Sequence, residues 1–378
     1  MSCTTALRLL LGLLAMGLAP MPAFAQIESL TKSLGLEESA RPVKEIVPGW
    51  RVPRKIVVLV ENAERARWLQ QSIPDVRIVG VQSVAEAEGE LRDADAAVQF
   101  RCDVATFSDA PNLKWIHASA GGSDGCLQIP AVARGDILLT DSRKVKTLVL
   151  SEMAMGYVFA LARSIDVAVD NQRRRDLTAG GRPAMQLKGR TMLIVGLGGA
   201  GTEIARMAHA MGMHVIATRN SSRRGPPFVE HVGLADELPL LIGGADIVMI
   251  AAPLTPRTKA LFDKRMFARM KRGAMFVNWS RADIVVPEDL AAALVSGQVG
   301  SAALNWATPA PLPQDHPLWR APNLILAPWG GTGGGAGTSD AREPPEQVEQ
   351  RWQVVRENIR RFVTGDRMYS LVDPARGY

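Results

Sequence analysis

The 378-residue sequence contains few of the residues that build metal sites and disulfide-rich folds. It has three cysteines and five histidines, and none of their spacings resembles the ligand pairs of a structural zinc site, so we expect no metal. Cys3 lies near the N-terminus, which leaves Cys102 and Cys126 for a bond within the fold. These two could pair in an oxidising compartment. Two free thiols are the alternative, because the sequence does not give their separation.

The sequence also lacks long apolar runs and a strong net charge. Beyond the N-terminal 25 residues, we expect no run to reach the ~20 apolar residues of a membrane-spanning helix. The formal net charge is +6, with 22% charged and 47% hydrophobic residues, which excludes a disordered chain and allows large buried cores. The basic residues are dispersed apart from the run Arg219 to Arg224, which favours a small anionic ligand over nucleic acid.

The first 25 residues have the three parts of a secretory signal peptide. A start that carries Arg8 is followed by an apolar stretch from Leu9 to Leu18 and by an Ala-x-Ala end at Ala25. This pattern predicts cleavage after Ala25 and export to the periplasm. No twin-arginine pair is present. An uncleaved membrane anchor, and a misassigned start that leaves the protein in the cytoplasm, are the alternatives.

Short apolar runs alternate with amphipathic stretches in two series, the first beginning at Lys55 and the second at Thr191. Strands interleaved with helices are typical of βαβ units, so the sequence predicts two α/β domains with mostly parallel sheets. An apolar helix over residues 147–163 and an arginine-rich stretch over residues 171–190 separate the two series. The glycine-rich segment from Gly330 to Gly337 is either a flexible connector or a ligand-cradling loop. Residues 345–364 predict a final amphipathic helix.

A glycine-rich turn lies between a predicted strand over residues 191–197 and a predicted helix over residues 202–211. The turn reads Gly196-Leu197-Gly198-Gly199-Ala200-Gly201, and in this context G-x-G-x-x-G indicates a dinucleotide site. Gly196 permits the tight turn, Gly198 lets the pyrophosphate approach the backbone, and Gly201 allows the helix to pack closely on the strand. A merely structural turn is the alternative.

The end of the next predicted strand indicates which dinucleotide is bound. It has no acidic residue to accept a hydrogen bond from the ribose 2′-hydroxyl, and it carries Arg219, Asn220, Ser221 and Arg223 instead. Arginine suits a 2′-phosphate because it forms charge-assisted hydrogen bonds. The sequence therefore favours NADP over NAD, with a solvated basic loop as the alternative.

Several motifs in order resemble those of the D-isomer-specific 2-hydroxyacid dehydrogenases, the family of glyoxylate/hydroxypyruvate reductases and phosphoglycerate dehydrogenase. They are Leu113–Asp124, Gly196–Gly201, Pro253–Thr258, Met270–Arg281, Asp315–Trp319 and the closing segment from Val372. The resemblance implies two doubly wound parallel-sheet domains. After an extension over residues 26–54, a flavodoxin-like substrate domain would comprise residues 55–152 and 331–378, with a Rossmann domain inserted at residues 153–330. It also implies a homodimer.

The resemblance further implies hydride transfer between a nicotinamide and a 2-oxo or 2-hydroxy acid, with Arg281 holding the acid. The family's glutamate and histidine are replaced by Ala310 and Trp329, and Asn305 stands where an aspartate is usual. The cofactor contacts implied near the nicotinamide are Ala252, Pro253, Thr258, Trp279, Asn305 and Trp329. Trp279, Trp306 and Trp329 either stack on a ligand or fill space left by smaller polar groups.

The predicted function is NADP(H)-dependent reduction of a 2-oxo acid or a related carbonyl compound by an altered or weakened proton relay. His117 is the candidate replacement for the missing acid, and a structural histidine is the alternative. A second hypothesis is a non-catalytic dinucleotide- or acid-binding protein of the cell envelope, because Ala310 and Trp329 remove the relay as a unit. A third is a structural or partner-binding protein.

Overall fold

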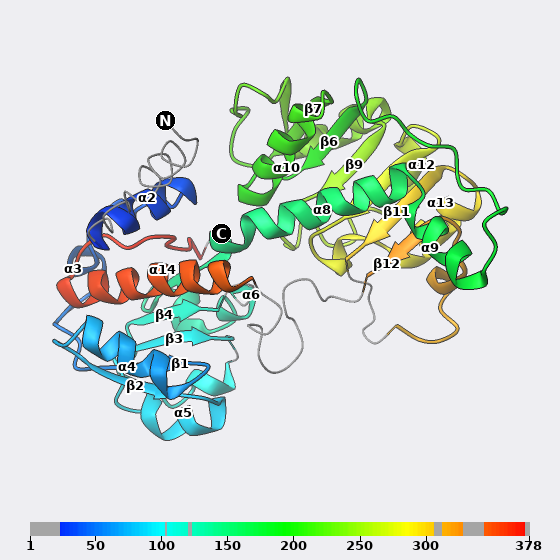
Figure 1. Cartoon of the computed structure of the whole chain (residues 1–378). Coiled ribbons are helices and arrows are strands. Elements are labelled where there is room, and N and C mark those ends of the chain that lie inside the picture. Colours follow the sequence, from blue (N-terminus) through cyan, green and yellow to red (C-terminus); the bar gives the residue numbers. More distant parts are fainter. Residues whose placement is uncertain (1–22, 103, 120–122, 306–311, 328–343, 375–378) are drawn as a thin grey trace, which may run out of the picture. The chain divides into compact units, whose positions relative to one another are not determined.

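The computed structural model describes residues 23–102, 104–119, 123–305, 312–327 and 344–374 (Figure 1). The chain divides into two compact units, one comprising residues 1–142 and 346–378 and the other residues 143–345. The first unit therefore takes its final helix from the other end of the chain, and in Figure 1 this red helix, α14, lies beside the blue and cyan elements.

The first unit is built on a five-stranded parallel sheet in the order β2-β1-β3-β4-β5. The strands are β1 Lys55–Leu59, β2 Arg77–Val81, β3 Ala96–Phe100, β4 Trp115–Ala118 and β5 Leu138–Asp141. The helices are α2 Ala23–Ser33, α3 Val43–Ile46, α4 Ala63–Ser72, α5 Val84–Leu91, η1 Ala105–Phe107, α6 Ser123–Cys126, α7 Pro130–Ala133 and α14 Pro345–Thr364.

Apolar clusters cover both faces of this sheet, which is why its strands read as continuous apolar runs. On one face, Trp352 and Ile359 of α14 pack against Ile56 of β1. On the other, Leu91 of α5 packs with Val57. Two of the helices begin where the sequence supplies caps: the Asn62 side chain accepts from Arg65 N at 2.9 Å before α4, and Ser83 caps α5 in the same way.

The second unit is built on a seven-stranded parallel sheet in the order β12-β11-β10-β9-β6-β7-β8. The strands are β6 Thr191–Val195, β7 His214–Arg219, β8 His231–Leu234, β9 Ile247–Ile250, β10 Ala274–Asn278, β11 Val299–Leu304 and β12 Leu324–Leu326. The helices are η2 Arg143–Lys146, α8 Thr147–Ala162, α9 Ile165–Arg174, α10 Gly199–Ala210, η3 Ala235–Glu237, α11 Leu238–Leu241, η4 Ile242–Gly244, α12 Lys264–Arg269, η5 Ala282–Ile284, α13 Pro287–Val295 and η6 Pro317–Arg320. The prediction of two parallel-sheet α/β domains is confirmed.

Helix α8 opens the second unit and is apolar on most of its circumference. Met155 and Val158 lie in one apolar cluster with Ile204 of α10. The boundary expected between residues 152 and 153 falls inside this helix, which runs unbroken to Ala162. The stretch Arg143–Ala162 is long and apolar enough to cross a membrane by length and composition, contrary to the expectation that no run beyond the N-terminus would be. Its packing against α10 accounts for the apolar side chains on its buried face.

The N-terminal extension folds into the first unit. Ser39 N–H donates to Met368 O at 2.7 Å, and Val43 N–H donates to Asp366 O at 2.9 Å. Val43 is fully buried in the same cluster as α14. The expected signal peptide falls mostly on residues 1–22, which lie outside the described residues, and the expected cleavage point after Ala25 falls within α2.

Candidate cofactor and substrate site

The strand order of the second unit reverses on either side of β6. From β6 the chain proceeds to β7 and β8 on one side, and then to β9, β10 and β11 on the other. In open α/β sheets, ligands bind outside the carboxyl ends of the strands at such a switch point. The predicted glycine turn follows β6, so the fold places it at this point.

Backbone geometry explains two of the glycines. Gly196 has a φ of +104°, and a Cβ there would lie 2.7 Å from Ala252 N and Cα. A Cβ at Gly201 would overlap Gly196 O, so only glycine lets α10 begin so close to β6. A Cβ at Gly198 would point into open space. The turn therefore brings the predicted contact Ala252 against Gly196.

The first turn of α10 has donors for an anion. Gly198 precedes the helix in an extended conformation, with no side-chain cap. The first amides of a helix lack intrahelical acceptors and attract phosphate. Gly199, Ala200 and Gly201 supply those amides, so the cradle fits a dinucleotide pyrophosphate.

The predicted 2′-phosphate residues gather at the end of β7. Arg219 Nε donates to Ser221 Oγ at 3.0 Å, and Arg219 Nη1 donates to Arg224 O at 3.2 Å. Among the described residues, Arg219 has no ion pair, and its hydrogen bonds are to neutral oxygens. Asn220 Oδ1 accepts from Arg257 at 3.2 Å. Arg223 forms an ion pair with Glu237 at 2.5 Å, and this contact raises the pKa of Arg223 and lowers that of Glu237.

Polar groups also gather at the ends of β9 and β10. Thr258 Oγ1 donates to Pro253 O at 2.7 Å, and Ser280 Oγ donates to Ala252 O. Asn278 Nδ2 donates to Arg281 O at 2.9 Å. Together these bonds join the segment after β9 to the segment after β10, and they fix the backbone of the half-buried Arg281.

Sequence reasoning missed the bridging residues Asn278 and Ser280. A signal was available, because they are polar residues placed immediately after the apolar strand residues 274–277. Open α/β sheets place such positions at the ligand edge.

Within the described part of the chain, two buried polar atoms at this edge have no hydrogen-bond partner, namely Trp279 Nε1 after β10 and Asn305 Oδ1 after β11. Both residues are more than nine-tenths buried. Trp279 packs against Tyr157 of α8 with ring centroids 5.4 Å apart, which supports the space-filling alternative for its ring. An unsatisfied buried donor and acceptor on neighbouring strands fit a bound amide such as that of nicotinamide.

His117 lies inside the sheet of the first unit. Its Nδ1 is 2.7 Å from Thr140 Oγ1, and its Nε2 is 2.8 Å from Ser142 Oγ. Trp115 Nε1 donates to the same Thr140 oxygen at 2.9 Å. Complete burial, with a contribution from Arg351, lowers the pKa of His117 to about 3. A neutral ring with both nitrogens engaged supports the structural alternative over proton donation at neutral pH.

Other predicted positions lie outside the described residues, namely Ala310, Trp306, Trp329 and the glycine-rich segment at residues 330–337.

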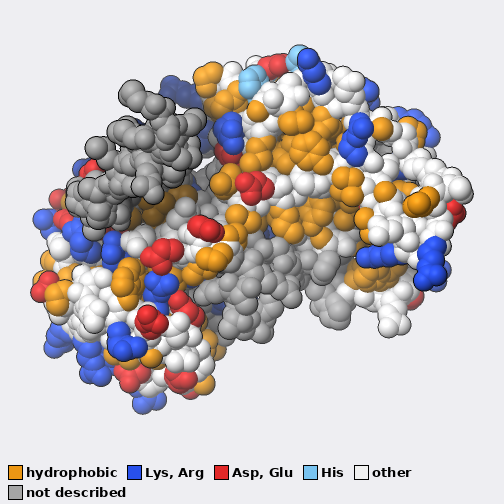
Figure 2. All heavy atoms as spheres, viewed as in Figure 1, with side chains coloured by type: hydrophobic (Ala, Val, Ile, Leu, Met, Phe, Trp, Pro, Cys, Tyr) orange, Lys and Arg blue, Asp and Glu red, His pale blue; other side chains and the backbone are white. Residues whose placement is uncertain are grey.

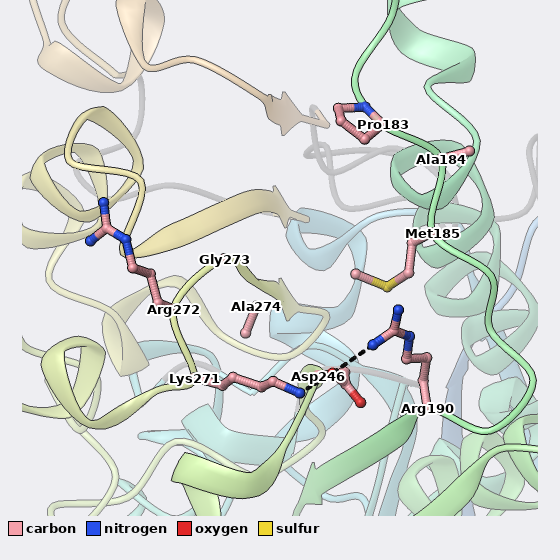
Figure 3. A pocket seen from close by; sticks show the side chains of 9 residues that line it. All are labelled: Pro183, Ala184, Met185, Arg190, Asp246, Lys271, Arg272, Gly273 and Ala274. Carbon is pink, nitrogen blue, oxygen red and sulfur yellow. Dashed lines mark hydrogen bonds and ion pairs between the residues drawn. The ribbon is translucent and has the colours of Figure 1, made fainter.

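A pocket at the opposite, amino edge of the second sheet is held by ion pairs (Figure 3). Lys271 Nζ lies 2.7 Å and Arg190 Nη1 3.4 Å from Asp246 Oδ1, and Thr191 N–H donates to Asp246 at 3.0 Å. These contacts lower the pKa of Asp246 although burial opposes them. Asp246 therefore joins β9 to its neighbouring strands, and two of the pocket's cations are used within the fold.

The sequence profile described as "D-isomer specific 2-hydroxyacid dehydrogenase, NAD binding domain" matches residues 155–331. The chain is 30% identical over 284 residues to a glyoxylate reductase of Korarchaeum cryptofilum, a match that covers 73% of this chain and 82% of that protein. It is 26% identical over 322 residues to a D-3-phosphoglycerate dehydrogenase of Methanocaldococcus jannaschii, covering 84% of this chain but only 59% of that protein.

Among solved structures, the chain is similar to an NADPH-dependent glyoxylate/hydroxypyruvate reductase from Sinorhizobium meliloti in complex with NADP and sulfate. The TM-score is 0.69 at 26% identity, and the match covers 86% of this chain and all of that chain.

Proposed function

Because the chain belongs to the D-isomer-specific 2-hydroxyacid dehydrogenase family, whose members are NAD(P)-dependent oxidoreductases, we propose that it exchanges hydride between NADP(H) and a small 2-oxo or 2-hydroxy acid. The observation that carries this proposal is the joined edge of the second sheet, where the glycine cradle after β6 meets Ala252 and where Asn278 fixes Arg281 after β10. One edge thus presents both a dinucleotide cradle and a cation for an acid.

The chain's own residues have separable roles in this reaction. When bound, NADPH supplies the hydride that is added to C2 of the acid. Gly199, Ala200 and Gly201 donate backbone hydrogen bonds to the pyrophosphate. Arg281 holds the carboxylate by charge-assisted hydrogen bonds and polarises the carbonyl oxygen that receives the proton. Trp279 Nε1 and Asn305 Oδ1 orient the nicotinamide amide.

We infer a weakened proton relay, because Ala310 and Trp329 occupy the positions where family members carry a glutamate and a histidine. A positioned acid typically contributes ~10²–10⁴ in rate. With His117 neutral and enclosed, the proton is drawn from water. The Ala310→Glu/Trp329→His double variant should raise the rate, and each single variant should have little effect.

NADP is the proposed cofactor. Arg219 and Ser221 lie together at the end of β7 and suit a 2′-phosphate, and the S. meliloti relative was solved with NADP. The test is the ratio of kcat/KM for NADPH to that for NADH in the wild type and in Arg219→Asp. We expect the wild type to prefer NADPH and Arg219→Asp to reverse that preference. An unchanged ratio would contradict the assignment.

The substitutions at Ala310 and Trp329 keep a non-catalytic binding protein as the second candidate function. Titration calorimetry with NADPH and with oxalate, an unreactive diacid, measures binding, and an assay of NADPH oxidation measures catalysis. The two measurements together separate a reductase from a binding protein. Binding without NADPH oxidation, even in the double variant, would favour the binding protein.

We propose a homodimer through the second unit. Leu148, Phe159, Ile165 and Val169 of α8 and α9 are all at least one-third exposed, and Figure 2 shows hydrophobic side chains gathered over the region of α8. A second copy of the chain would cover such a face by a twofold contact. Sedimentation velocity should give a dimer for the wild type and a monomer for Phe159→Glu/Ile165→Glu.

We also propose export to the periplasm with removal of residues 1–25. Fractionation of cells that express the full chain, with N-terminal sequencing of the product, is the test. A periplasmic protein beginning at Gln26 would support export, and a membrane-bound or cytoplasmic protein that retains Met1 would contradict it.

A further inference from the structure

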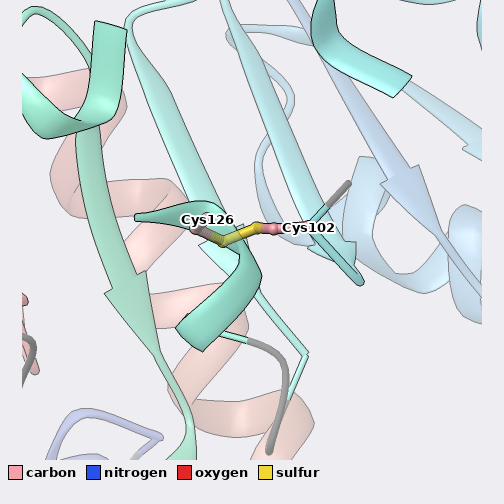
Figure 4. The surroundings of a disulfide bond; sticks show 2 residues. All are labelled: Cys102 and Cys126. Atoms are coloured by element: carbon pink, nitrogen blue, oxygen red, sulfur yellow. A yellow bond between two sulfur atoms is a disulfide. The ribbon is translucent and has the colours of Figure 1, made fainter. Parts of the chain in front are cut away.

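A disulfide joins two segments that leave the same edge of the first sheet (Figure 4). Cys102 is the second residue after β3, Cys126 ends α6 after β4, and their Cα atoms are 4.6 Å apart. Strands β3 and β4 are parallel neighbours. Both cysteines therefore lie at the carboxyl edge, where open α/β sheets bind ligands.

Two further contacts join the same segments. Ser119 N–H donates to Phe100 O at 3.0 Å. A Cβ at Gly125 would overlap Cys102 O, so only glycine permits this approach of α6 to residue 102. The disulfide, the Ser119 bond and the Gly125 approach together form what we call the edge clamp.

The two sulfur-bearing residues differ in exposure. Cys126 is fully buried in an apolar cluster with Phe100, Ile129 and Val132, whereas Cys102 is partly exposed. Disulfide exchange begins with attack by a thiolate on an accessible sulfur. A soluble dithiol therefore approaches from the side of Cys102.

We propose that the Cys102–Cys126 disulfide is a redox-controlled clamp on the substrate-binding edge of the first unit, opened by a dithiol and closed by a disulfide oxidant. In opening, one thiolate of the dithiol attacks Cys102 Sγ, and Cys126 leaves as a thiolate that takes up a proton. The second thiolate of the dithiol then displaces Cys102 as a thiolate, which takes up a proton in turn. Two electrons pass from the dithiol to the protein, so the dithiol becomes a disulfide and the protein gains two thiols. Closing is the reverse.

Reduction of the disulfide should affect substrate binding because of the residues that lie in the loop closed by this bond. The bond closes a loop that contains β4, Ser119 and Gly125, and its release removes the covalent constraint on these residues. The glycine cradle belongs to the second unit and lies outside the loop that the disulfide closes. Reduction should therefore weaken binding of the acid and leave NADPH binding unchanged. This consequence rests on the proposed function and on the substrate domain that the resemblance implies for residues 55–152 and 331–378.

The test compares the oxidised and dithiothreitol-reduced forms of the mature wild-type protein, with alkylation and mass spectrometry to count thiols. The probes are glyoxylate and NADPH for turnover, and oxalate for binding. We expect reduction to raise the KM for glyoxylate and the Kd for oxalate by about fivefold or more, with the Kd for NADPH unchanged. The Cys102→Ser/Cys126→Ala variant should have the weak affinity in either buffer.

Gly125→Ala is a second test of the clamp, because a methyl group there disturbs the approach of α6 to Cys102 without removing a sulfur. It should weaken oxalate binding even under oxidising conditions. Equal oxalate affinity in both redox forms, or two free thiols in protein isolated from its native compartment, would overturn the proposal. If glyoxylate is not reduced in any form, the proposed function fails, and the clamp is still decided by oxalate affinity and by hydrogen exchange of residues 115–119.

Discussion

The imidazole Nδ1 of His117 lies 2.7 Å from the hydroxyl oxygen of Thr140, inside a sheet and fully buried. Because burial lowers the pKa of His117 from 6.5 to about 3, the unfolded chain binds a proton below pH 6.5 that the folded chain does not. The free energy of unfolding should therefore fall as the pH decreases from 6.5 towards 3, and His117 contributes no pH dependence above that range.

For His117 alone, the expected loss between pH 6.5 and 4.5 is about 2 kcal/mol. Urea unfolding at several pH values measures it. His117→Asn should lower the stability at pH 7 and remove most of this slope. His214→Asn, at a half-exposed histidine paired with Glu230, is the control and should keep the slope. If the free energy of unfolding of His117→Asn depends on pH as steeply as that of the wild type, the pKa of His117 is not lowered by burial.

Gly201→Ala tests the cradle. A methyl group at this position overlaps Gly196 O and displaces the start of α10, so the affinity for NADPH should fall by about tenfold or more. Fluorescence titration with NADPH measures the change. Gly89→Ala provides the comparison, because the helical Gly89 has open space around its Cβ position. Gly89→Ala should leave the affinity for NADPH unchanged. Equal affinities of Gly201→Ala and Gly89→Ala for NADPH would show that a side chain at position 201 does not disturb the cradle.

Asp246→Asn separates a structural role from a ligand site at the amino edge. The carboxylate holds Lys271, Arg190 and the backbone N–H of Thr191. Its replacement by an amide should lower the free energy of unfolding by about 1–3 kcal/mol, with no change in the Kd for NADPH or oxalate. A change in either Kd at unchanged stability would indicate that the pocket binds a ligand.

The disulfide should also stabilise the fold apart from any effect on binding. It closes a loop over a sequence separation of 24, and a loop of that length constrains the unfolded chain by about 3 kcal/mol. Urea unfolding of the oxidised wild type and of Cys102→Ser/Cys126→Ala should differ by that amount. If the two proteins unfold at the same urea concentration and with the same dependence of the free energy of unfolding on urea, the disulfide does not stabilise the fold.

The sequence was sufficient to predict the parts of the fold that local patterns determine. Alternating apolar runs gave both parallel sheets, and the spacing of Gly196, Gly198 and Gly201 indicated a strand-to-helix turn. The partners of His117 could not be predicted in this way, because Thr140 lies on β5 and Ser142 directly follows it, and only sheet register brings them to the ring. The pairing of Cys102 with Cys126 stayed open for the same reason, since a spacing along the chain gives no distance in space.

We expect this chain to reduce 2-oxo acids with NADPH while Arg281 holds the acid. The most direct measurement is the rate of NADPH oxidation with glyoxylate by the mature wild-type protein and by Arg281→Ala. We predict slow but saturable turnover in the wild type and a rate lower by about 10²–10³ in the variant, at an unchanged Kd for NADPH. NADPH binding without any glyoxylate-dependent oxidation, or equal rates in the two proteins, would contradict this role of the chain and of Arg281.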